Sequence, residues 1–145
     1  MRLKEGDIVA VPVESDSLML CRVLYKSQYF KHVALVGCYG RFIESLPVAL
    51  QLQSGLVGVP LYTTVQPKKI GSWQRLDNQQ LSEQEIQLSL RIVAGDVWLG
   101  DNHLGAASET ELASLPQMDV YGDRLFARRI SNNVSSLPTA RGGRL

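Results

Sequence analysis

Residues 6–24 read GDIVAVPVESDSLMLCRVL, and they predict the first hairpin of a small β-barrel. Gly6-Asp7 has turn chemistry, because glycine tolerates a positive φ and an aspartate side chain bonds to nearby backbone. Residues 8–13 are rich in β-branched side chains, which favours a strand. A polar reversal at residues 14–17 leads into a second apolar run at residues 18–25. Nothing in this hairpin predicts catalysis.

The composition is typical of one folded domain. The chain has 145 residues, 45% hydrophobic and 20% charged, which is enough to bury most of its apolar surface without disulfides or metals. Its 15 basic and 14 acidic side chains nearly cancel, so no global field would attract nucleic acid or membranes. No apolar signal follows the charged residues at positions 2–5, and the two cysteines suit a reducing compartment. We therefore expect a cytoplasmic protein.

The rest of the chain predicts a mainly β (α+β) fold with a barrel-like antiparallel sheet. Residues 31–38 form a third strand, and a turn at Tyr29 and Phe30 would place Cys21 opposite Cys38. That pair suits either a strained disulfide or two reduced thiols, which apolar surroundings would leave inert. At residues 48–53 an alternating strand and a short helix both fit. Further strands are expected at residues 59–65, 72–76, 90–93 and 97–99.

Two or three short helices complete the expected fold. The serine–glutamate pairs at positions 82/85 and 108/111 match capping boxes, in which each side chain bonds to the other residue's backbone N–H. A final helix should begin at Asp123 and end near Ser131, with Phe126 and Ile130 on one face. The domain would then span residues 1–132, and residues 133–145 would form a flexible tail.

The chain offers few residues for catalysis or metal binding. His32 and His103 lack partners at the spacing of a metal site, and both are expected in loops. Asp96 and Asp101 either act together in acid–base or metal chemistry, or cap turns beside a buried Trp98. No serine-hydrolase elbow or glycine-rich phosphate loop is present. We therefore expect no cofactor, no metal site and no catalytic residue.

Aromatic and basic residues are interleaved around the second and third strands. Tyr29 and Phe30 lie at a predicted turn, and Tyr39, Arg41 and Phe42 follow the third strand. Such residues anchor protein interfaces or stack on nucleic-acid bases, and they can also simply close the end of a barrel. If neighbouring turns gather at one end of the barrel, these five residues form a single binding surface.

A set of landmarks recurs in order over residues 4–131. These are GDIVAVP at 6–12, RV at 22–23, GSW at 71–73, GDVWLGD at 95–101, LG at 104–105 and Gly122. In order and spacing they resemble the immunity protein 26 family of bacterial polymorphic toxin systems. Leu20-Cys21 departs from the glycine and aromatic residue that relatives often have there. The resemblance implies a mostly β domain that binds a cognate toxin and blocks it, with no catalytic residues.

We therefore expect a cytoplasmic immunity protein that neutralises a toxin by protein–protein contact. The candidate interface residues are Tyr29, Phe30, Tyr39, Arg41 and Phe42. A small-barrel module that binds nucleic acid is the alternative, and an enzyme using Asp96 and Asp101 is a third hypothesis. Strong acidity would indicate an inhibitor that mimics nucleic acid, but the near-neutral charge leaves the chemistry of the toxin open.

Overall fold

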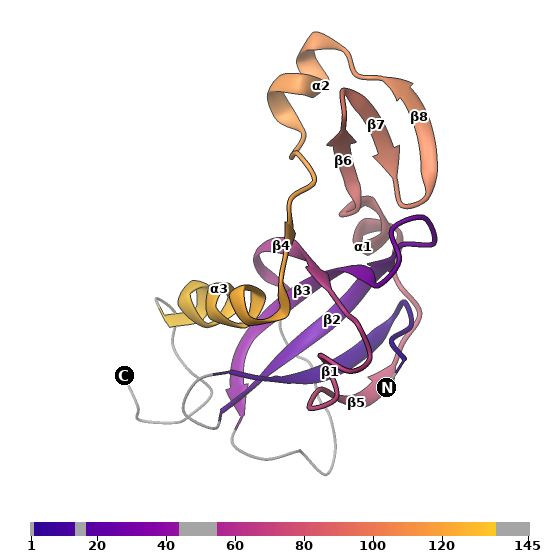
Figure 1. Cartoon of the computed structure of the whole chain (residues 1–145). Helices are drawn as coiled ribbons and strands as arrows, with labels where there is room; N and C mark the ends of the chain where they lie inside the picture. The colour runs from indigo at the N-terminus through magenta and orange to yellow at the C-terminus, as the bar shows by residue number, and fades with distance from the viewer. Residues whose placement is uncertain (1, 14–16, 44–54, 136–145) are drawn as a thin grey trace.

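The computed structural model describes residues 2–13, 17–43 and 55–135 (Figure 1). They form a mainly β, α+β fold. The strands are β1 (Asp7–Pro12), β2 (Leu18–Lys26), β3 (Val33–Ile43), β4 (Val57–Thr64), β5 (Gln74–Asn78), β6 (Leu90–Val93), β7 (Asp96–Leu99), β8 (Asn102–Ala106) and β9 (Val120–Tyr121). The helices are α1 (Glu83–Gln87), α2 (Glu109–Ser114) and α3 (Asp123–Ser135). The alternatives at residues 48–53, and the tail from residue 136, lie outside the described residues.

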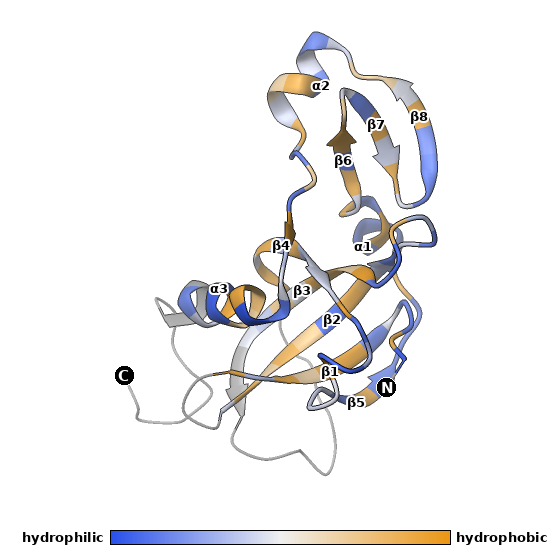
Figure 2. Cartoon of the chain, in the orientation of Figure 1, coloured by the Kyte–Doolittle hydropathy of each residue, from blue (hydrophilic) through white to orange (hydrophobic). Residues whose placement is uncertain are grey.

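The expected first hairpin is confirmed and forms the middle of a six-stranded sheet. Its strand order is β5-β1-β2-β3-β4-β9. Ile8 pairs with Arg22 across β1 and β2, and Cys21 lies opposite Cys38 across β2 and β3, as the turn position predicted. The hydropathy colouring in Figure 2 shows that apolar residues follow one another along β1 and β2. Such continuous apolar strands are typical of a sheet that is covered on both faces.

The sheet does not close into the expected barrel. Its two edge strands are β5, which pairs with β1, and β9, which pairs with β4. Residue pairs are antiparallel throughout the sheet except at β9, which runs parallel to β4 beside Tyr62 and Thr63. Closure requires hydrogen bonds between the two edges. Here β9 pairs with β4 and not with β5 at the other edge, so the sheet stays open.

Helix α3 covers one face of this sheet and completes the larger core. Phe126 and Ile130 are 0% and 2% exposed, which confirms that they share the buried face of the helix. The ring of Phe126 lies 5.8 Å from that of Trp73, which is also buried. The helix continues to Ser135, beyond the expected end near Ser131. This core also includes Val9, Val11, Met19, Val23, Val36 and Ile70.

A second, three-stranded sheet with the order β6-β7-β8 projects from the first (Figure 1). The β6–β7 hairpin turns through Ala94 and Gly95, whose φ angles of 50° and 85° are both positive. That geometry is typical of the type I′ turn that matches the twist of a two-residue hairpin. The expected loop around His103 is wrong, because residues 102–106 form β8. Most of β8 is exposed, so it lacks the apolar alternation that predicts a strand.

Both expected capping boxes are present, and one of them reaches the main sheet. In α1, Ser82 Oγ accepts from the Glu85 N–H at 3.1 Å, and Glu85 accepts from the Ser82 N–H at 2.9 Å. Glu85 also accepts from Arg22 of β2 at 3.0 Å, and Arg22 is only 3% exposed. The Arg22 side chain donates in addition to the carbonyl of Gly6 at 2.7 Å. Arg22 therefore joins the first hairpin to α1.

Candidate binding surface

The turn between β2 and β3 presents two aromatic side chains on a hydrogen-bonded frame. Ser27 Oγ accepts from the N–H groups of Tyr29 and Phe30 at 3.2 and 2.8 Å. The Val33 N–H donates to the Phe30 carbonyl at 3.1 Å and so closes the turn. Tyr29 is 70% exposed and Phe30 is 46% exposed. Two large rings are therefore held in solvent by backbone that is already ordered.

The second sheet backs this turn. The Tyr29 ring lies 5.9 Å from that of Trp98 in an edge-to-face arrangement, and the Trp98 ring lies 5.0 Å from that of His103. Trp98 is half-buried in this contact, so the expectation that it is a core residue is wrong. We call Tyr29, Phe30, Trp98 and His103 the aromatic turn surface. It joins residues from both sheets.

Asp101 fastens the turn to the second sheet. Its carboxylate accepts from the Tyr25 hydroxyl at 2.5 Å and from the Gln28 N–H at 3.3 Å. Burial, followed by this bond to Asp101, raises the pKa of Tyr25. The hydroxyl of Tyr25 therefore keeps its proton near neutral pH and remains a donor to Asp101.

A buried arginine supports the same junction from behind. Arg91 is 1% exposed, and its guanidinium lies 5.0 Å from the ring centre of Tyr25 and 5.4 Å from that of Tyr62. It donates to the carbonyls of Gly100 and Ser89 at 2.7 and 3.2 Å. Burial raises the pKa of Tyr62 to about 12, so the ring stays neutral. These contacts make the junction between the sheets rigid.

The β2–β3 turn separates two cavities of opposite charge. The first, of about 290 Å³, has no carboxylate in its wall, and we call it the basic cavity. Its lining residues are Arg2, Leu3, Lys26, Ser27, Gln28, Lys31, His32, Val65 and Pro67. The second, of about 280 Å³, holds Glu5 and Asp101, and we call it the acidic pocket. Its other lining residues are Leu24, Tyr25, Gln28, Leu81, Ile86, Ser89, Leu99, Gly100 and Asn102.

The structure brings together only two of the five candidate interface residues. Tyr29 and Phe30 share the turn, whereas Tyr39, Arg41 and Phe42 lie in β3, which continues without a turn to Ile43. Tyr39 is 8% exposed and packs with Ile8 and Leu20. The backbone of Phe42 pairs with Met19, towards the end of β3 that is remote from the turn. The side chains of Arg41 and Phe42 lie outside the described residues.

Asp96 and Asp101 have separate partners. Asp96 contacts His103 Nε2 at 2.8 Å, whereas Asp101 is bound to Tyr25 and Gln28. Both aspartates thus take part in structural contacts, but these contacts are to a side chain of the next strand and to a distant turn rather than caps of their own turns. In the described ranges, no group of three histidine, cysteine or acidic side chains is placed to hold a metal ion.

Cys21 and Cys38 are both free thiols. Burial raises the pKa of Cys21, as expected for a thiol in apolar surroundings. The pKa of Cys38 is lowered instead, because Cys38 Sγ accepts hydrogen bonds. The Cys21 thiol donates one of them, and the Gly40 N–H donates the other at 3.3 Å. Both side chains remain almost wholly buried.

Trp98 and His103 belong to the aromatic turn surface and Asp101 binds the same turn, but their positions in the sequence did not predict that they lie near it. They lie about half the length of the chain after Tyr29 in the sequence. No local sequence pattern shows which turn a distant hairpin will contact. The one available signal is the aromatic residue at position 98 in an otherwise short, half-exposed strand. Arg2 was not predicted as a neighbour of the turn for the same reason, because only the folded chain brings it into the wall of the basic cavity.

Comparison of the chain with protein-family models, curated proteins and solved structures gave no match. In the described part of the chain, no helix combines the length and apolar character needed to cross a membrane.

Proposed function

We propose that this protein is a cytoplasmic immunity protein that neutralises a toxin by binding it through the aromatic turn surface, without catalysis of its own. One observation carries the proposal. Tyr29 and Phe30 are 70% and 46% exposed, yet their turn is ordered by Ser27 and backed by Trp98. Aromatic side chains supply most of the energy in many interfaces, and an ordered backbone lowers the entropy cost of binding.

The resemblance to the immunity protein 26 family supports a toxin as the partner. Its landmarks fall on residues that maintain the scaffold, such as Asp7, Arg22 and Trp73, all of which are buried. A buried scaffold that carries an exposed turn would suit a protein that recognises its partner through that turn. The proposed role depends on the exposed turn and on Trp98, a residue of the landmark at 95–101 that contacts Tyr29.

The charges around the turn favour a protein partner over nucleic acid. Lys26 and Lys31 lie on one side, in the basic cavity, and Glu5 and Asp101 lie on the other, in the acidic pocket. A nucleic-acid strand needs a continuous basic track and would be repelled by the two carboxylates. A protein surface can present both signs of charge and match them.

The test is co-expression with a toxin domain taken from a gene that neighbours this one. Wild-type protein should restore growth, and the double variant Tyr29→Ala/Phe30→Ala should not. Loss of two anchors should cost about 2–4 kcal/mol of binding, or about 30- to 1,000-fold in Kd. The thermal midpoint should barely change, because both rings are largely exposed.

The control removes two equally exposed apolar side chains elsewhere. Val59 and Leu125 are 69% and 45% exposed, close to the values for Tyr29 and Phe30. The variant Val59→Ala/Leu125→Ala should protect as well as wild type. If cells die at the same rate with and without the wild-type protein, the proposed function fails for that toxin. If both double variants protect fully, the turn is not the interface.

A further inference from the structure

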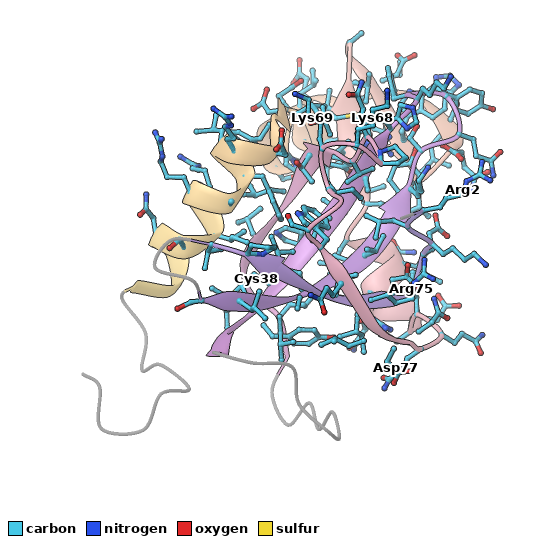
Figure 3. All side chains as sticks on the ribbon, turned by 60° about the horizontal axis from the view of Figure 1, so that its bottom comes forward. Arg2, Cys38, Lys68, Lys69, Arg75 and Asp77 are labelled. Carbon is cyan, nitrogen blue, oxygen red and sulfur yellow. The ribbon has the colours of Figure 1, made fainter. Side chains whose placement is uncertain are left out.

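The basic cavity gathers positive charge that the protein does not neutralise. Among the described residues, Arg22–Glu85 and Arg75–Asp7 form ion pairs and Asp96 contacts His103, and none of these involves a residue of this cavity. Lys68 and Lys69 follow Pro67, a lining residue of the cavity, on the turn after β4 (Figure 3). Like charges that share a cavity repel one another, and an anion between them would relieve that repulsion.

The nearest carboxylates are turned to other partners. Glu5 accepts from the Lys26 backbone N–H at 3.1 Å, and Asp101 accepts from the Gln28 N–H at 3.3 Å. Both carboxylates line the acidic pocket on the other side of the turn. Neither Glu5 nor Asp101 is among the residues that line the basic cavity.

The frame of the cavity is ordered and locally strained. His32 has a φ of 61°, a left-handed conformation that costs a non-glycine residue energy. Its carbonyl accepts from the Val65 N–H at 2.7 Å, which ties the turn to the end of β4. This bond holds His32 and Lys31 at the wall of the cavity. Backbone strain of this kind is concentrated at ligand sites.

We propose that the basic cavity binds the phosphoryl group of a small phosphorylated molecule. Arg2, Lys26 and Lys31 supply three permanent positive charges, and Ser27 and Gln28 add neutral hydrogen-bond donors. A phosphoryl dianion matches this set better than a single carboxylate, because it has more charge and three acceptor oxygens. The cavity of about 290 Å³ gives space for the group and part of its carrier.

The acidic pocket restricts the ligand to a small molecule. A nucleic-acid strand leaving the basic cavity over the turn would meet Glu5 and Asp101. Its next phosphates would therefore be repelled. A mononucleotide or a sugar phosphate has one charged end and avoids that clash.

Titration calorimetry on the full chain tests the proposal with inorganic phosphate and with adenosine monophosphate. Either probe should bind and should compete with the other. Lys26→Gln/Lys31→Gln should weaken binding about tenfold or more, because it removes two charge-assisted contacts. Arg124→Gln/Arg128→Gln is the matched control, since it removes two positive charges from the exposed face of α3 and should leave affinity unchanged.

The two probes distinguish the source of the phosphoryl group. Equal affinities support the free anion as ligand, whereas tighter binding of the nucleotide supports a phosphate ester. Amide NMR shifts on phosphate addition should cluster at residues 26–32, a readout that does not depend on any variant folding. The proposal fails if neither probe binds at millimolar concentration, or if the shifts lie elsewhere. It also fails if a short oligothymidylate binds more tightly than the nucleotide and its affinity falls with salt as steeply as several phosphate contacts require.

Discussion

Arg22 carries a positive charge into a nearly solvent-free position, 3% exposed, and Glu85 balances it. Removing one partner of such a pair leaves the other charge buried without compensation. The same reasoning applies to Asp7, which is 0% exposed and accepts from Arg75 at 2.9 Å and from Asn78 at 2.8 Å. Asp7 and Arg22 lie in the landmarks at positions 6–12 and 22–23, so these two landmarks contribute to the scaffold.

Glu85→Gln should destabilise the protein by about 1–3 kcal/mol at neutral pH, because Arg22 keeps its burial but loses its ionic acceptor. Glu111→Gln is the matched control: Glu111 makes the same capping box with Ser108, at 2.9 and 3.1 Å, and it forms no ion pair. It should change stability by less than about 0.5 kcal/mol. Urea unfolding followed by circular dichroism measures both, and equal effects would contradict a role for the ion pair.

The contribution of Glu85 should also depend on pH. Burial alone would raise the pKa of Glu85, but the bonds from Arg22 and Ser82 outweigh it and hold the pKa below its usual value. A lower pKa in the folded state means that the unfolded chain binds more protons, so stability falls as the pH falls. The difference between wild type and Glu85→Gln should therefore be full above the ordinary glutamate pKa of 4.5 and should decline as the pH falls through the lower pKa of the folded state. A difference that stays constant at acid pH would contradict this.

At the scale of elements, sequence motifs a few residues long predicted helices and strands that local interactions stabilise. The two capping boxes gave the starts of α1 and α2, because each depends on side chains three residues apart. The first hairpin was equally predictable, and its register followed from the turn position. Strand β8 was missed because its side chains face solvent and carry no apolar alternation.

The β6–β7 turn offers a test at this scale. Gly95 has a φ of 85° and open space around its missing Cβ, so Gly95→Ala adds conformational strain without a clash. We expect a loss of about 1–2 kcal/mol. Gly122 also has open space but no positive φ, so Gly122→Ala should be neutral or slightly stabilising. Thermal unfolding of both variants decides the matter, and a neutral Gly95→Ala would show that the hairpin tolerates another turn.

At the scale of the molecule, the main sheet depends on α3 for one covered face. Phe126 is 0% exposed against Trp73, so Phe126→Ala should cost about 3–5 kcal/mol of unfolding free energy. Leu125 is the neighbouring control: it is 45% exposed, and Leu125→Ala should cost less than about 0.5 kcal/mol. Chemical unfolding measures both. Similar losses would mean that α3 packs on another face.

Long-range placement explains what the sequence did not reveal. The periodicity of apolar residues and the helix caps predict strands and helices, but they do not show which edge of the sheet a later strand such as β9 will join. The expected barrel was wrong for this reason, because β9 pairs with β4. The candidate surface was half predictable for the same reason. Tyr29 and Phe30 stood out as aromatics in a turn, while their contact with Trp98 needed the second sheet in place.

Among the residues that the structure describes, β9 pairs with β4 only at Tyr62 and Thr63, so the rest of β4 has no partner on that side within this set. An unpaired edge is a template on which a second chain can add a strand and begin to aggregate. Pro60 counters this, since it has no N–H to donate, and Gly58, with a φ of 67°, disrupts the flat geometry that strand addition needs. The same open edge that distinguishes this fold from a barrel therefore carries its own protection against self-association.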